Sequence, residues 1–379
     1  MLDVPGGAVP EASENPSFEA DAGATVALAF EGRRSRLLLS YAPTFTLTDF
    51  TGNRSRQLLN TVTLGLGYRG RRYVLALTEA VSYGQRRFTG LTPPEVNPVT
   101  GMVVTQVVPG PATVLYANSV TQATANFRLT RRQELMLVVG YNIGGGINEE
   151  SRLTLPLVSG PRAETRWTYR LTLRDNLGTS LTALRVHTHD KPINAAEPVN
   201  TGSVALTEHW THVWEKSTTT DLSAGVALLV EGEPRKRTKP YGQGFATFTR
   251  TFPTAHRHAV IQLLAGAGVA ILVDQVSGQA QPVAQANLQG AWSQNPVRLY
   301  LNVGAIKSLE SSQANAAEVA TAELGARYSL SKRLDLALGV RANDQSIFAP
   351  KGPAAAGAAN GFSYAAFVGL VWHPDALVL

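Results

Sequence analysis

Apolar and polar residues alternate along most of the chain, from about residue 24 to the C-terminus. In 166–174, for example, aromatic residues and leucines at odd positions alternate with arginines and threonines at even positions. Successive side chains of a β-strand face opposite sides, whereas a helix repeats every 3.6 residues. The pattern therefore predicts an all-β chain whose strands each have one apolar and one polar face.

The alternating segments are long. Seventeen of them can be distinguished between residues 24 and 373, and many exceed ten residues. Strands of globular proteins usually have about five or six residues, whereas a strand that crosses a membrane needs about nine to eleven. Strand length therefore favours membrane-spanning strands over a soluble sandwich.

Short and long connections follow one another in turn. Short turns are expected at 32–34, 70–71, 131–132 and 216–217, and long loops at 85–115, 145–162, 190–202 and 346–359. Outer-membrane barrels have this arrangement, with tight periplasmic turns and longer outer loops. The predicted fold is a large single-chain antiparallel transmembrane β-barrel in the bacterial outer membrane.

The predicted strand number is odd, whereas bacterial single-chain barrels have even numbers. We favour 18 strands, with 16 as the fallback, because residues 9–22 supply a poor strand or because another strand lies upstream. Residues 1–23 are then a periplasmic segment or poor first strand, truncated at its start and without a signal peptide. Residues 24–373 form the barrel, and 374–379 form a C-terminal tail.

Composition agrees with a wall between lipid and water. Charged residues are 16% of the chain, below the roughly 25% of soluble domains, while apolar residues are 44%. No apolar run reaches the about 18 residues that a membrane-spanning helix needs. The net charge is +6, but the basic residues are spaced along turns and alternate strand positions, so no nucleic-acid partner is expected.

The polar side of the predicted wall carries many of the charged residues in the strands. It either forms a hydrated conduit with a positive bias or an ion-pair lattice that braces the wall. The row Arg166, Arg170 and Arg174 is the best candidate for function, because like charges along one strand repel unless a partner or solute compensates them. The candidate lumen-lining residues are Arg128, Arg166, Arg170, Arg174, Arg185, His187, His189, Arg298, Arg327, Arg341, Glu134, Glu323 and Asp335.

Aromatic residues on the apolar side gather near predicted strand ends. Membrane barrels carry aromatic girdles at the headgroup level, although aromatic residues also favour strands in general. The girdle candidates are Tyr41, Tyr68, Tyr73, Trp167, Tyr169, Trp210, Trp214, Trp292, Tyr328, Tyr364 and Trp372. Glu79, Glu208 and His212 break the apolar pattern, and a β-bulge at each is the expected explanation.

No convincing catalytic or cofactor motif accompanies the strands. Neither a GxSxG nucleophile turn nor a phosphate-binding loop is present. Ser180 with His187, or with His209, is a weak candidate for a hydrolase, and the pair His187 and His189 is a weak candidate for metal binding. We expect no enzyme activity, no cofactor and no metal. The proline-rich loop 85–115 is instead hypothesised to fold inward and narrow the pore.

Several hairpins resemble those of a known family. The segments Glu31 to Pro43, Leu129 to Leu137, Trp210 to Gly225 and Leu330 to Leu338 are similar to hairpins of the outer-membrane barrels that accompany exopolysaccharide secretion in bacteria such as the myxobacteria. The chain ends on Leu379 instead of an aromatic residue, so Trp372 would serve as the terminal aromatic. The resemblance implies an export barrel for a capsular or slime polysaccharide that works with periplasmic export proteins.

The expected function is therefore an outer-membrane channel for a secreted polysaccharide. A general or anion-preferring diffusion porin for small anionic solutes is the alternative in the same class, and an outer-membrane hydrolase is the alternative from another class. The expected partners are outer-membrane lipid, the polysaccharide or anionic solutes, and periplasmic export proteins.

Overall fold

A computed structural model of the chain describes residues 18–50, 53–88, 95–96, 103–104, 112–154, 157–189, 200–232, 237–253, 260–273, 280–309, 316–331, 334–348 and 361–372. Nearly all of these residues lie in strands, so the predicted all-β class is confirmed. No helix in these ranges is long and apolar enough to cross a membrane. Most of loop 85–115 and the tail 374–379 lie outside the described residues.

The wall is built from long strands, each of 12 to 17 residues. They are β3 (Ser35–Phe50), β4 (Asn53–Arg69), β5 (Tyr73–Phe88), β8 (Ala112–Arg128), β9 (Gln133–Gly146), β10 (Val158–Arg170), β11 (Asp175–Thr188), β12 (Asn200–Glu215), β13 (Thr218–Glu231), β14 (Arg237–Pro253), β15 (Val260–Val273), β16 (Ala280–Gln294), β17 (Val297–Ser308), β18 (Ala316–Ser331), β19 (Leu334–Phe348) and β20 (Gly361–Trp372). At about 3.4 Å per residue these strands are long enough to cross a bilayer at a tilt.

Five short elements complete the described chain. They are β1 (Phe18–Gly23), β2 (Val26–Glu31), the paired β6 (Glu95–Val96) and β7 (Val103–Val104), and the helix α1 (Glu149–Thr154). The helix begins after Asn148, whose side-chain Oδ1 accepts a hydrogen bond from the backbone N of Ser151 at 3.0 Å. Ser151 Oγ in turn accepts one from the backbone N of Leu115, which ties α1 to the start of β8.

One antiparallel sheet contains eighteen strands, the number that the sequence favoured. From β3 to β20 each strand pairs with the next one along the chain, with β5 pairing directly to β8. β1 pairs with residues 44–49 of β3 and β2 with residues 36–41, so the two together fill one position of the wall. The residues before 24 therefore extend the first strand and, over 18–23, add no further position.

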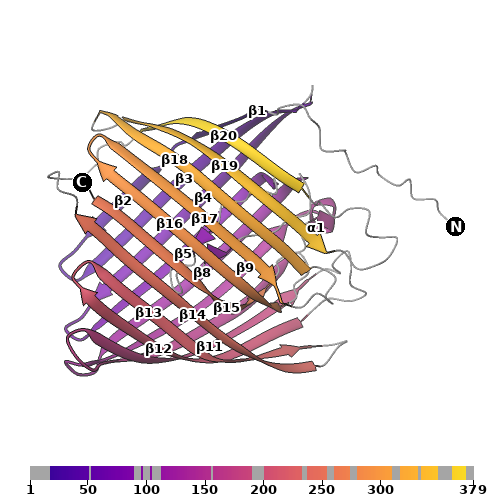
Figure 1. Ribbon diagram of the computed structural model, residues 1–379. Coiled ribbons are helices and arrows are strands. Elements are labelled where there is room, and N and C mark those ends of the chain that lie inside the picture. The colour runs from indigo at the N-terminus through magenta and orange to yellow at the C-terminus, as the bar shows by residue number, and fades with distance from the viewer. Residues whose placement is uncertain are drawn as a thin grey trace.

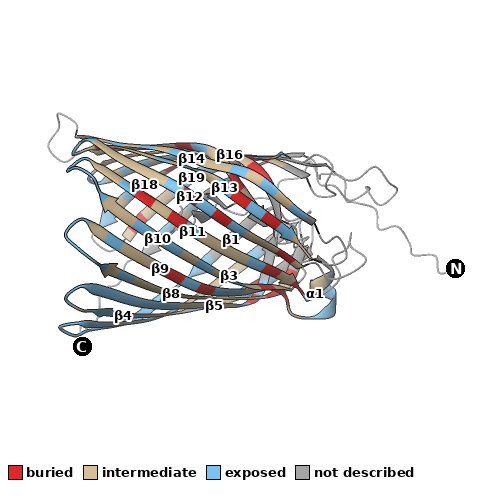
Figure 2. Cartoon of the chain, turned by 90° about the horizontal axis from the view of Figure 1, so that it is seen from below, coloured by how far each residue is buried: buried red, intermediate tan, exposed pale blue. Residues whose placement is uncertain are grey.

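The sheet curls into a barrel with inclined strands (Figure 1). In the described residues no backbone pairing joins β20 to β1 or β2, so the two ends of the sheet form a seam. Buried positions are scattered among exposed ones along the strands (Figure 2), as expected for a hollow wall with two accessible faces and no solid core.

Tight hairpins carry pairs of arginines. Exposed pairs lie at Arg33–Arg34, at Arg71–Arg72 and at Arg131–Arg132, each between two long strands or between β2 and β3. The hairpin between β10 and β11 is held by Thr172, whose Oγ1 accepts hydrogen bonds from the backbone N of Arg174 at 3.0 Å and of Asp175 at 2.9 Å. These short turns all join strands at the same end of the barrel.

The wall bends sharply between β12 and β16. These strands are four places apart in the ladder, about 19 Å in a flat sheet, yet their Cα atoms come within 8 Å of each other. Glycines permit the bend: a Cβ at Gly225 would lie 2.0 Å from the carbonyl oxygen of Leu206, and one at Gly268 would lie 2.1 Å from that of Gly244. We call this region, β12 to β16, the corner; the side chains of Ala227 and Leu229 are buried inside it.

Replacing Gly225 by alanine should therefore destabilise the barrel, because the new Cβ has no space beside the backbone of β12. Overpacking costs about 1–3 kcal/mol, and more where backbone must move. We expect a lower urea midpoint and a smaller folded fraction by heat-modifiable electrophoretic mobility. Gly242→Ala is the matched control, because nothing lies within 4 Å of its added Cβ; equal stability of the two variants would contradict a bend that depends on Gly225.

Candidate functional site: the inner wall

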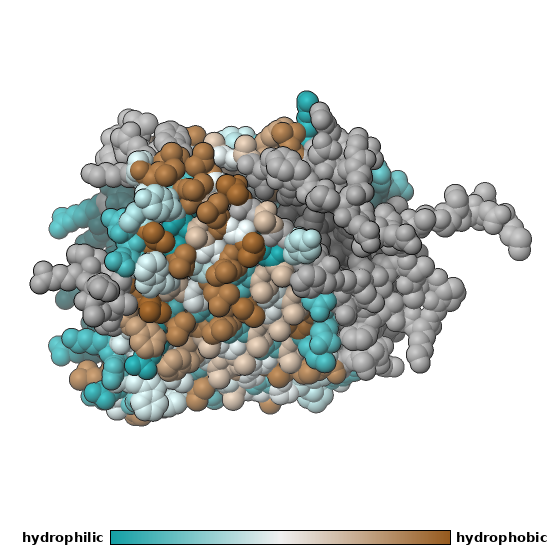
Figure 3. Space-filling model, turned by 45° about the horizontal axis from the view of Figure 1, so that its top comes forward, coloured by the Kyte–Doolittle hydropathy of each residue, from teal (hydrophilic) through white to brown (hydrophobic). Residues whose placement is uncertain are grey.

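Strand register assigns every side chain to one of two faces, because directly opposed residues in a sheet share a face. One face carries Leu37, opposite Leu66, which is opposite Leu77, and this apolar face is exposed. Figure 3 shows such hydrophobic side chains gathered on the outer surface of the wall. The other face, which carries Arg36, Gly67 and Ala76 at the same level, is therefore the inner one.

Small residues dominate the inner face of β3 to β5. They include Thr61, which shares a hydrogen bond with Ser82 at 3.0 Å, and the glycines Gly65 and Gly67. A Cβ at Gly65 or Gly67 would meet its neighbours only at ordinary contact distance, so close packing does not require these glycines. Short side chains here leave the interior open.

A first group of charges lies on the inner face of β8 to β10. Arg128 stands directly opposite Glu134, and Arg166 forms an ion pair with Glu164 at 3.5 Å. Arg162, on the same face as Arg166 and Arg170, donates a hydrogen bond to Gln122. Sequence reasoning missed Arg162, although its spacing of four from Arg166 was the available signal, because the strand was expected to begin one residue later.

A second group lies on the inner face of β17 to β19. Arg341 binds Glu323 through two nitrogens, with N–O distances of 2.7 and 2.9 Å. Arg298 and Arg327 face each other directly across β17 and β18, and neither has an ion-pair partner among the described residues. Asp335, also on this face, is buried. Among the described residues, Arg341 and Arg166 are thus in ion pairs, whereas Arg298 and Arg327 are not.

Four of the expected lumen residues lie elsewhere. Arg174 belongs to the turn after β10, so the arginine row on that strand is Arg162, Arg166 and Arg170. Arg185 and His187 share the face of the lipid-facing Leu181, and His189 follows the same alternation just past the strand end. The physical reason is the unbroken register of β11, which keeps odd-numbered residues on the outer face.

The two outer histidines are paired within the wall. His187 Nδ1 lies 2.6 Å from Asn200 Oδ1, and His189 Nε2 lies 2.8 Å from Ser159 Oγ. Among the described residues, no group of three or more potential metal ligands occurs. Each imidazole has a neutral hydrogen-bond partner, and these bonds link neighbouring strands of the wall.

Ser180 and His209 come together on the inner face, with Ser180 Oγ 2.7 Å from His209 Nε2. A hydrolytic triad also needs a group that orients the second ring nitrogen. No carboxylate in the described part of the chain forms a hydrogen bond with that nitrogen of His209. Ser180 and His209 therefore form a hydrogen-bonded pair in the wall, and no described carboxylate orients His209 as a catalytic triad would require.

Comparison with known protein families identifies the family of this chain. The model of the EpsX exopolysaccharide export family matches residues 7–371. The chain belongs to the EpsX exopolysaccharide export family. No significant match was found among curated proteins.

Solved structures show the same fold. The FrpB iron transporter of Neisseria meningitidis, F5-1 variant, aligns with a TM-score of 0.55 at 10% identity, covering 93% of this chain and 66% of that one. The F3-3 variant aligns with a TM-score of 0.52 at 11% identity, covering 87% of this chain and 61% of that one. This EpsX-family chain thus spans less than two thirds of their length. Family and fold together place it in the bacterial outer membrane as a β-barrel.

Aromatic residues mark the outer face of this EpsX-family barrel near the short turns. Tyr68 and Tyr73 stack with ring centroids 6.0 Å apart, as do Trp167 and Tyr169. Asp175 accepts hydrogen bonds from Trp210 Nε1 at 3.2 Å and from His212 Nδ1 at 2.6 Å, and the register of β12 shifts directly after His212, between Val213 and Glu215. The register also places Trp292 and Tyr328 on the outer face near short turns, Tyr41 and Tyr364 farther along their strands, and Trp372 opposite Leu334. Trp214 lies at the register shift and donates a hydrogen bond from Nε1 to Thr220 Oγ1 of the outer face at 2.9 Å.

The spacing of tyrosines on β5 fits the apolar thickness of an outer membrane. Tyr73 and Tyr83 are ten residues apart on the outer face, about 34 Å along the strand and about 24 Å along the axis at a tilt of about 45°. The apolar band of such barrels is about 25 Å tall. We therefore propose that the two tyrosines belong to opposite girdles.

Glu79 lies between these tyrosines and faces outward. The register of β5 is continuous on both sides of it, so the expected bulge is wrong, and the same holds for Glu208 on β12. Protein contacts replace the bulge: Ser119 Oγ donates to Glu79 at 2.7 Å, Thr121 donates to its other oxygen, and Thr179 Oγ1 donates to Glu208 at 2.8 Å. These hydroxyl donors reduce the free-energy penalty of placing a carboxyl group in the apolar band of the barrel.

Removing both donors to Glu79 should destabilise the barrel in lipid. We expect the double variant Ser119→Ala, Thr121→Val to lose about 1–3 kcal/mol of unfolding free energy, the penalty of an unsatisfied polar group. Urea unfolding in lipid vesicles, followed by tryptophan fluorescence, measures this loss. Thr165→Ala is the control, since Thr165 is an exposed outer-face threonine; losses of equal size would argue against hydroxyl support of Glu79.

The arginines of β10 should bias ion passage. Replacing Arg166 and Arg170 by glutamine removes positive charge from the inner wall, so the reversal potential in planar bilayers under a KCl gradient should shift toward cation selectivity. Arg250→Gln is the control, because Arg250 lies on the outer face, 4.4 Å over the ring of Phe252. If the control shifts the reversal potential as much as the double variant, the inner arginines do not set selectivity.

Proposed function

We propose that this EpsX-family barrel is the channel through which an exopolysaccharide crosses the outer membrane. The observation that carries the proposal is the inner face, where small and polar residues line β3 to β5 and charged groups line β8 to β10 and β17 to β19. A long polar polymer needs a hydrated path, and transport alone requires no catalytic group. Family membership supports the polymer as cargo.

The size of the wall supports passage of a chain. Seventeen wall positions at about 4.8 Å, tilted by about 40°, give a circumference of about 107 Å and a backbone diameter of about 34 Å. Barrels of about 16 to 18 strands leave an aqueous channel, whereas eight-stranded barrels are filled by their own side chains. The corner narrows this interior on one side, so the opening is not circular.

A diffusion porin for small anionic solutes is the second candidate, favoured by Arg298 and Arg327, which face each other and form no ion pair with a described residue. A porin conducts solutes without other proteins, whereas an export channel requires that the polymer be delivered to it from the periplasmic side. We therefore propose periplasmic export proteins as partners of the export channel, acting at the end with the short turns. No enzymatic step belongs to the proposal.

Deletion of the gene in the native host, with the full chain restored on a plasmid as control, tests the function. We expect surface polysaccharide to be lost and regained on complementation, with uptake of small anionic solutes unchanged, because the polymer has no other route across the bilayer. Normal surface polysaccharide together with lost solute uptake would overturn export and leave the porin.

A further inference from the structure

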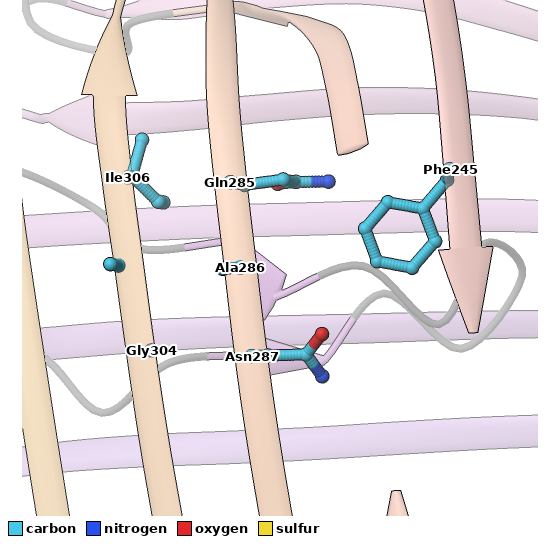
Figure 4. Close-up of a pocket in the computed structure, with 7 residues that line it drawn as sticks. Phe245, Gln285, Ala286, Asn287, Gly304 and Ile306 are labelled. Carbon is cyan, nitrogen blue, oxygen red and sulfur yellow. The ribbon is translucent and has the colours of Figure 1, made fainter. Parts of the chain in front are cut away.

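An aromatic ring and two amide side chains meet on the inner face of the corner (Figure 4). Phe245 comes from β14, and Gln285 and Asn287 come from β16. Together with Gly304 and Ile306 of β17 they line a small hollow. The hollow itself holds little more than a water molecule, so a larger ligand reaches these side chains only when they move.

Glycines of β15 give the ring of Phe245 its position. A Cβ at Gly266 would lie 2.8 Å from Cζ of Phe245, and a Cβ at Gly268 would lie 2.5 Å from its Cδ2. The ring therefore lies against the backbone of β15, where any larger residue would displace it. The corner thus presents an aromatic ring on the inner face of the wall.

The two amides are buried without partners. Gln285 is 9% exposed and Asn287 is 8% exposed. In the described part of the chain, Gln285 Nε2 and both Nδ2 and Oδ1 of Asn287 have no hydrogen-bond partner. Buried polar groups are nearly always paired, because an unmade hydrogen bond is costly, so these three atoms require an explanation.

Two other inner-face amides are paired within the wall. Gln243 Nε2 donates to Thr207 Oγ1 at 2.5 Å, and Gln122 Nε2 donates to Thr124 Oγ1 at 3.3 Å while its oxygen accepts from Arg162. The unpaired amides of β16 therefore do not reflect a general lack of partners on this face. They occur beside the ring of Phe245.

We propose that Phe245, Gln285 and Asn287 form a subsite for an uncharged pyranose unit of the exported glycan, an inference that rests on the proposed function. A sugar ring has a C–H face, which matches the electron-rich face of an aromatic ring, and hydroxyls that both donate and accept. Asn287 offers one unpaired donor and one unpaired acceptor, and Gln285 offers a second donor. No charged residue lines the hollow, which is why the unit is uncharged.

Binding at this subsite includes a side-chain movement. The amide Oδ1 of Asn287 and the ring of Phe245 both lie against Gly266, at 2.6 and 2.8 Å from the position of an added Cβ. Rotation of the Phe245 ring toward the lumen uncovers the amide and brings the ring over the sugar. Weak binding of this kind suits a conduit, which must hold its cargo strongly enough to admit it and weakly enough to release it.

Current blocking in planar bilayers tests the subsite with purified full-length protein and maltohexaose as a neutral pyranose probe. We expect maltohexaose to interrupt the wild-type current, and Phe245→Ala to weaken its binding about threefold to tenfold through loss of stacking. The matched control is Phe248→Ala, which removes a phenylalanine from the outer face of the same strand. An unblocked wild-type channel, or equal effects of the two variants, overturns the subsite.

Asn287→Leu separates binding from a structural role. Replacing unpaired polar atoms by an apolar side chain should raise the urea midpoint while weakening maltohexaose blocking. A residue that only supports the wall would lose stability when replaced, so a lower midpoint contradicts the proposal. This test and the gene deletion can fail separately. If the deletion abolishes export but maltohexaose blocks the variants as strongly as the wild type, the subsite alone is wrong. If the deletion strain still exports polysaccharide, the export function is wrong, even when maltohexaose blocks the variants less.

Discussion

Backbone hydrogen bonding in lipid is the constraint on which this molecule depends. The hydrocarbon core supplies no partners for amide and carbonyl groups, so a chain that crosses it must pair them internally. Here the pairing runs without a break from β3 through β20, and β1 and β2 share the free side of β3. Once the ladder is fixed, alternation sends one set of side chains to lipid and leaves the other set to define the interior.

Much of this could be read from the sequence because period-two alternation is a local signal. The seventeen expected segments correspond to β2, β3, β4, β5 and β8 to β20, and turns such as 131–132 are where they were expected. Features that depend on partners across the sheet could not be read in the same way. Arg185 and His187 were assigned to the wrong face, since only the register with β10 and β12 shows which parity of β11 faces outward.

The candidate subsite was also invisible in the sequence. Nothing in the segment 281–293 distinguishes Gln285 and Asn287 from the other amides of β16, and Phe245 lies forty residues earlier. What brings them together is the bend at Gly225 and Gly268, whose glycines read as ordinary small residues in the sequence. Curvature of a sheet arises from contacts between strands, and a single strand does not encode it.

The arginine pairs of the short hairpins give the barrel a polarity along its axis. Arg33–Arg34, Arg71–Arg72 and Arg131–Arg132 place exposed positive charge around one mouth, close to where strands from β2 to β9 turn. Fixed charge at an opening raises the local concentration of oppositely charged groups within about a Debye length, roughly 8 Å at physiological salt. Any anionic group should therefore reach this mouth at a rate that falls as ionic strength rises, whatever the interior then selects.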